Sequence, residues 1–83
     1  MERISGPHEG YFLACYTVAG CEGVFAYAKI CLQRPLDVWQ AAAVDKVAVG
    51  PYLAEQPALA AVQSKAHRAC LRKRRTLSGS WPT

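Results

Sequence analysis

With 83 residues, the chain is long enough for one small domain and too short for two hydrophobic cores. Apolar residues make up 52% of it, but no stretch approaches the ~18 consecutive apolar residues that a membrane-spanning helix needs. The net charge of +4 is unevenly placed, because residues 65–83 carry six basic side chains and no acidic one.

The beginning of the sequence carries no signal peptide pattern, because the residues MERISGP are not followed by an apolar run. We therefore expect a cytoplasmic, reducing setting, in which the four cysteines favour free thiols over a disulfide framework. Residues 1–83 are expected to form a single small domain. Gly6-Pro7 indicates a leader loop over residues 1–8, and residues 76–83 are expected to form a disordered tail.

The clearest structural signal is an antiparallel β-hairpin. Residues 11–18 and 24–32 are rich in aromatic and β-branched residues, and the turn Gly20-Cys21-Glu22-Gly23 lies between them. This pattern predicts two strands joined by a tight connection.

The apolar pattern predicts a register for this hairpin. Pairing Val18 with Val24 and Phe12 with Ile30 makes one face entirely apolar. A shift by one residue would place Lys29 on that face, so we predict the unshifted register.

The second face of the hairpin is mixed but rich in aromatic side chains. Two strands alone are unstable in water and leave open edges. We therefore expect a homodimer, formed by edge pairing or by stacking of this face. The candidate interface residues are Tyr11, Leu13, Phe25 and Tyr27.

The middle segment, residues 37–49, is ambiguous between a helix and a third strand. Asp37, with Gln40 three residues later, is typical of a capping box, and Gly50-Pro51 is typical of a helix end. The valines of this segment favour a strand instead. The capping and stop signals lead us to predict a helix.

A C-terminal helix is predicted over residues 57–73. Pro57 suits a first helical position, and one face at helical spacing is apolar: Leu59, Val62, Ala66, Ala69 and Cys70. The predicted fold class is therefore α+β, with the hairpin covered by this helix and the middle segment packed alongside.

The basic residues of this helix are the main candidates for binding nucleic acid or another anion. Lys65, Arg68 and Arg72 follow one another at helical spacing, and three more basic residues extend the stripe past residue 72. The candidate set is Lys65, Arg68, Arg72, Lys73, Arg74 and Arg75. The alternative is that these cations only complement the helix dipole and keep the protein soluble.

Catalytic and metal sites find little support in the sequence. His67 and Cys70 share a helix face, but a zinc site needs further ligands and the other cysteines lack the spacing of one. No carboxylate pair, nucleophile with a base, or phosphate loop is present. We expect no enzyme, no metal and no cofactor.

The segments GYFLACYTVAGCEGVFAYAKIC and PALAAVQSKAHRAC resemble a loose class of small uncharacterised bacterial proteins. In these proteins a β-hairpin that begins with Gly-Tyr is followed by an alanine-rich helix. The resemblance covers about residues 9–71 and implies an α+β fold and a bacterial cytoplasmic protein, with no activity or ligand attached.

Three functions remain. The first is a small, homodimeric binding or interaction module, with an acidic protein as a possible partner. The second is a nucleic-acid-binding protein that uses the basic end of the C-terminal helix. The third is a thiol-based redox or metal-responsive protein that uses His67 and Cys70.

Overall fold

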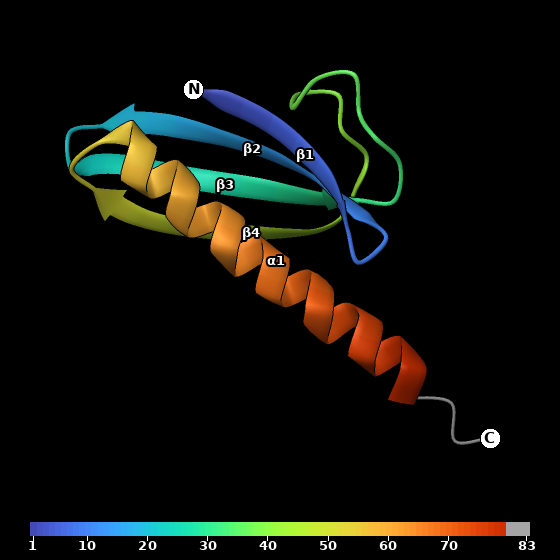
Figure 1. The fold of residues 1–83 in the computed structure, drawn as a ribbon. Coiled ribbons are helices and arrows are strands. Elements are labelled where there is room, and N and C mark those ends of the chain that lie inside the picture. Colours follow the sequence, from blue (N-terminus) through green and yellow to red (C-terminus); the bar gives the residue numbers. More distant parts are fainter. Residues whose placement is uncertain (80–83) are drawn as a thin grey trace.

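The computed structural model describes residues 1–79, with side chains described up to residue 73. The chain forms a four-stranded antiparallel sheet followed by one helix, which confirms the α+β class. The strands lie in sequence order and α1 crosses one face of the sheet (Figure 1). The elements are β1 (Glu2–His8), β2 (Tyr11–Gly20), β3 (Gly23–Cys31), β4 (Ala43–Tyr52) and α1 (Glu55–Gly79).

Strand β1 replaces the leader loop expected over residues 1–8. It pairs with β2 from Glu2 opposite Tyr16 to His8 opposite Tyr11. Gly6-Pro7, the basis of the loop prediction, lies at an irregularity of this ladder. An edge strand accepts proline there, because its outer side needs no hydrogen-bond partner.

The prediction of a helix over residues 37–49 is wrong. A loop over residues 32–42 leads instead into strand β4. The capping signal was real in part, since the Asp37 carboxylate accepts the backbone N–H groups of Trp39 at 2.8 Å and Gln40 at 2.9 Å. These bonds close a local turn with no helix behind it. Beyond the turn, Val47 and Val49 alternate toward the core as a half-buried strand requires.

The hairpin register differs by one residue from the prediction. Gly20 pairs with Gly23, leaving only two residues in the turn, so Val18 lies opposite Phe25 and Leu13 opposite Ile30. Two-residue turns match the twist of the strands, which favours this closer connection. The shift brings Lys29 onto the face that was predicted to be entirely apolar.

The core lies between the sheet and α1. Alternate residues of β2 and β3 enter it, together with one side of the helix, and the largest fully buried side chains there are Leu13, Ile30, Leu59 and Val62. Ala26 and Ala28 are also fully buried, which lets the helix lie close to β3. The apolar face predicted for the helix is thus confirmed.

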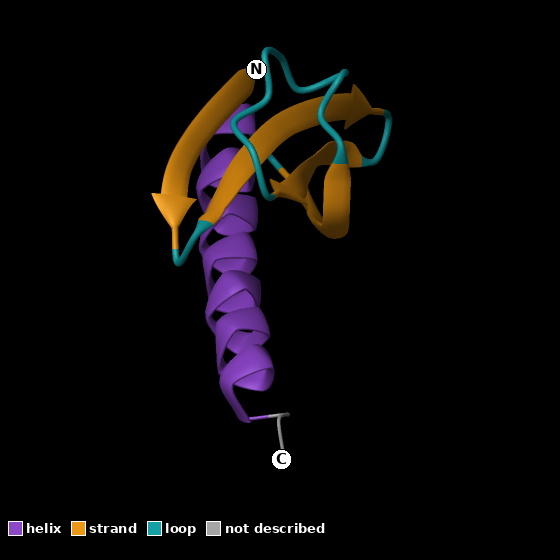
Figure 2. Ribbon diagram, turned by 90° about the vertical axis from the view of Figure 1, so that its right-hand side faces the viewer, coloured by secondary structure: helices purple, strands orange, loops and turns teal. Residues whose placement is uncertain are grey.

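Helix α1 is longer than the predicted 57–73, beginning at Glu55 and ending at Gly79. Its last core residue is Cys70, so its C-terminal part runs on past the strands (Figure 2). Within residues 1–79, this helix lacks the apolar character that a membrane-spanning helix needs. Of the tail expected over 76–83, residues 76–79 belong to the helix and residues 80–83 lie outside the described residues.

A smaller apolar cluster lies on the opposite side of the sheet, beneath the 32–42 loop. Ala14, Cys31 and Val38 are buried there, with exposed fractions of 1% or less. The Lys29 ammonium donates a hydrogen bond to the Val38 carbonyl at 2.9 Å and so holds the loop to the sheet. The loop covers only this end of the face.

Candidate nucleic-acid interface

The remainder of the face opposite α1 is a mixed aromatic and basic surface, which we call the open face. Strand alternation places its side chains in neighbouring rows across β2, β3 and β4. The open face consists of Tyr16, Val18, Phe25, Tyr27, Lys29 and Lys46, with Trp39 of the 32–42 loop at its margin.

The central row is aromatic. Tyr16 lies opposite Tyr27, and the two rings stack with centroids 5.3 Å apart at an interplanar angle of 24°. Trp39 packs against Tyr16 with centroids 4.7 Å apart, and its indole N–H donates to Glu2 at 3.0 Å. The exposed fraction of Trp39 is 59%, which is high for a tryptophan. Trp39 is therefore the exposed ring of this row, whereas Tyr16 and Tyr27 are half-buried.

The next row is basic. Lys29 lies directly opposite Lys46 across β3 and β4, and the Lys29 ammonium stands 5.9 Å from the centroid of the Tyr16 ring. Among the described strand residues on this side, the acidic one is Glu2 of β1, which lies opposite Tyr16 and accepts the Trp39 indole N–H; β2, β3 and β4 direct no acidic side chain there. Like charges directly opposite each other destabilise a sheet. This pair therefore costs stability that a lysine and a glutamate at the same positions would not.

Phe25 occupies the third row, over the backbone of Gly50. A β-carbon at Gly50 would stand 2.8 Å from the Phe25 ring, and the φ of Gly50 is +133°. The close contact and the backbone conformation each favour glycine at this position. Phe25 therefore packs over Gly50, on the same side of β3 as Tyr27.

The structure divides the four predicted interface residues between the two faces. Phe25 and Tyr27 lie on the open face, as expected. Tyr11 and Leu13 do not, because the register shift turns them toward α1, where their exposed fractions are 7% and 0%. Tyr16 takes their place on the open face.

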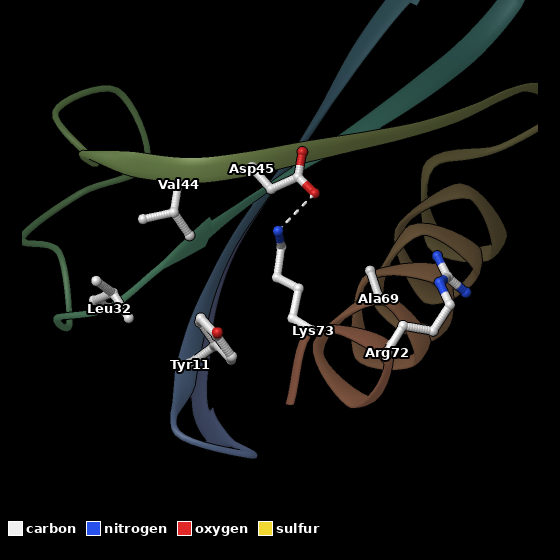
Figure 3. Close-up of a pocket in the computed structure, with 7 residues that line it drawn as sticks. All are labelled: Tyr11, Leu32, Val44, Asp45, Ala69, Arg72 and Lys73. Atoms are coloured by element: carbon white, nitrogen blue, oxygen red, sulfur yellow. Dashed lines mark ion pairs between the residues drawn. The ribbon is translucent and has the colours of Figure 1, made fainter. Parts of the chain in front are cut away.

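Two of the six basic candidates on the helix make contacts within the fold. The Lys65 ammonium donates to the Ala48 carbonyl at 2.9 Å. Lys73 pairs with Asp45 at 3.2 Å, across a cavity of about 590 Å³ where α1 leaves the sheet (Figure 3). Both lysines therefore brace α1 against β4.

The other four candidates are less engaged or lie beyond the described side chains. Arg68 and Arg72 are exposed, and Arg72 extends from α1 away from the Asp45–Lys73 pair (Figure 3). Arg74 and Arg75 belong to α1, but their side chains are outside the described part of the chain.

The cysteines and His67 do not converge on one site. Burial raises the pKa of the Cys15 thiol to about 11 and also raises the pKa of Cys31 and Cys70, each above the ordinary value of 9.0. Cys70 is buried in the core whereas His67 is exposed and packs on His8. Among the described residues, no three His, Cys, Asp or Glu side chains are grouped to hold a metal ion.

Tyr16, Trp39, Lys29 and Lys46 are the site residues that the sequence pattern missed. The turn could have revealed Tyr16, because a two-residue turn pairs Gly20 with Gly23 and so places Tyr16 opposite Tyr27. The cross-strand lysines required knowledge that residues 43–52 form a strand.

No family model, curated protein or solved structure matches this chain. The resemblance to small bacterial hairpin-and-helix proteins therefore stays a prediction.

Proposed function

We propose that the chain is a binding module for single-stranded nucleic acid, without catalytic activity, and that the open face is its binding surface. The observation that carries the proposal is the Lys29–Lys46 row beside the stacked Tyr16 and Tyr27. The Lys29 ammonium is held by the Val38 carbonyl, so the phosphate contact falls to the exposed Lys46, and a polyanion there would still offset the repulsion between the two positive charges. The phosphates of a single strand alternate with bases that stack on aromatic rings.

The exposed cations of α1 support the same class of ligand. Arg68 and Arg72 lie on the helix, and six basic side chains fall between residues 65 and 83 with no acid among them. Their field attracts a polyanion to this end of the molecule.

A homodimer that stacks two open faces is the second candidate, favoured by the exposed Trp39 and by Val18, which is 46% exposed. Stacking would bring two surfaces of the same positive charge together, and these repel each other. Edge pairing is disfavoured, because both edge strands contain a proline, Pro7 in β1 and Pro51 in β4. Nucleic acid fits the charge of the open face better than a second copy does.

The test is a fluorescence-anisotropy titration of labelled single-stranded RNA, single-stranded DNA and duplex DNA at low and moderate salt. Lys46→Glu should weaken single-strand binding and reduce the slope of log K against log salt by about 0.7–1. The same substitution should raise the free energy of unfolding by roughly 0.2–1 kcal/mol, because it pairs with Lys29. Loss of binding with a gain in stability excludes misfolding as the cause.

Arg34→Glu is the matched control, since it makes the same charge change in the exposed 32–42 loop, outside the open face. It should leave the salt slope nearly unchanged. A second variant changes Arg72, Lys73, Arg74 and Arg75 to serine. If this variant alone abolishes binding and Lys46→Glu has no effect, the basic helix is the binding surface and the open face is not. Absence of binding by the unaltered protein at low salt would refute both.

A further inference from the structure

A polar cavity lies between β1 and α1, on the helix side of the sheet and apart from the open face. Its volume is about 320 Å³. The residues that line it are Arg3, His8, Ala60, Gln63, Ser64 and His67. Apart from Ala60, each of them carries a group that can donate a hydrogen bond.

Arg3 and Gln63 form one side of this cavity. Strand alternation directs Arg3 toward the helix, where one guanidinium nitrogen donates to the Gln63 side-chain carbonyl at 3.2 Å. This bond uses the acceptor of the Gln63 amide and leaves its NH₂ group as a donor. The guanidinium has further N–H groups, arranged in the fork that matches two oxygens of an anion.

The two histidines form the other side. The His8 and His67 rings have centroids 5.1 Å apart at an interplanar angle of 48°. One nitrogen of His8, Nε2, is 3.1 Å from the Ser5 hydroxyl, which holds the ring in place. Each imidazole has a further ring nitrogen that can form a hydrogen bond with a ligand.

The charge of the cavity has one sign, because Arg3 lines it and no carboxylate does. Glu9 follows His8 in the adjacent turn, and its charge contributes to the raised pKa of Cys70, one helical turn beyond His67. It is not among the residues that line the cavity. Ala60 lines the cavity with a single methyl group, so a large side chain at that position would take up part of the space.

We propose that this cavity binds a tetrahedral oxyanion, a phosphate group held by Arg3, His8, His67 and Ser64. The phosphate can be free or the end of a phosphate monoester, because the two share this recognition chemistry. The site is independent of nucleic-acid binding at the open face, since it lies on the other side of the sheet.

Inorganic phosphate is the first probe, added at constant pH and ionic strength while the ring signals of His8 and His67 are followed by NMR. We expect both rings to respond in a saturable way to phosphate and not to chloride. A parallel titration with glycerol phosphate distinguishes the sources: tighter binding of the ester identifies a monoester site, and tighter binding of inorganic phosphate identifies a site for the free ion.

Ala60→Leu should fill the cavity without changing any charge and weaken phosphate binding at least about tenfold. Arg3→Gln should do the same, whereas Arg34→Gln, an equal charge change elsewhere, should not. Arg3→Gln could weaken binding by loosening β1. His67→Gln changes an exposed helix position instead, and it should also weaken phosphate binding. Binding should persist in Lys46→Glu. Equal responses to chloride, or full binding by both Ala60→Leu and His67→Gln, would overturn the proposal.

Discussion

At the scale of single residues, the four thiols have sharply different surroundings although all are free. Cys15, Cys31 and Cys70 are buried and Cys21 lies exposed in the β2–β3 turn. A thiol reacts through its thiolate, so burial lowers both access and reactive fraction. Their spacing in the sequence did not reveal this difference, because it depends on how β2, β3 and α1 pack and on the position of Cys21 in the turn.

The first prediction concerns thiol reactivity. In the native protein at neutral pH, iodoacetamide should modify Cys21 rapidly and the three buried cysteines only as fast as the chain unfolds. Mass spectrometry of quenched samples measures this, and Cys21→Ser should remove the rapid phase. Rapid labelling of Cys70 would instead indicate that the helix separates readily from the sheet.

The second prediction concerns alkaline pH. The pKa of Cys15 is about 11 in the folded chain against 9.0 as the ordinary value, so the folded state retains a proton that the unfolded state loses. The contribution of Cys15 to the free energy of unfolding should be fully present below pH 9 and be lost as the pH rises from 9 to 11. Cys31 and Cys70 act in the same direction. Urea titrations across this range should show a shallower decline for Cys15→Ala and an unchanged one for Cys21→Ser.

At the scale of secondary structure, the sequence supported the hairpin and the helix but not β1 or β4. Periodicity in α1 predicted its buried face, because the apolar residues from Leu59 to Cys70 keep a regular helical spacing. The prediction for residues 37–49 was wrong because an aspartate can accept the same capping hydrogen bonds in a turn as in a helix, and Asp37 does so in a turn. Two of the aromatic site residues, Phe25 and Tyr27, were placed correctly, since β3 alternates cleanly whichever register it adopts.

The third prediction tests how closely α1 approaches the sheet. Ala28→Leu should lower the free energy of unfolding by roughly 1–3 kcal/mol, because Ala28 is fully buried beneath the helix. Ala48→Leu, on the neighbouring strand but exposed, should change it by less than about 0.5 kcal/mol. Chemical denaturation gives both values, and equal effects would mean that the helix can move aside.

At the scale of the whole molecule, one open face has two possible occupants, nucleic acid and a second copy. The sequence anticipated an aromatic surface and a basic one, but it placed them on a hairpin and a helix. The structure joins aromatic and basic residues in a single surface, because Lys46 reaches it only when β4 pairs with β3. Tertiary pairing of that kind carries no local sequence signal.

The fourth prediction separates the two occupants by salt. Nucleic-acid binding should weaken as salt increases, because the release of counterions from the phosphates into a more concentrated salt solution is less favourable. Self-association of the open face should strengthen, because salt screens the lysine rows that repel each other. Sedimentation velocity of the protein alone, with and without labelled RNA, measures both. Dimers at low salt that dissociate at high salt would contradict this account.

The order of the strands in the sheet has a further consequence, for the sequence of events in folding. Each strand pairs with its immediate neighbour in the chain, so every ladder can begin as soon as its second strand is available. The helix that shields Leu13 and Ile30 follows all four strands. During synthesis the four strands therefore emerge before α1, and the apolar face of the sheet is briefly exposed to solvent.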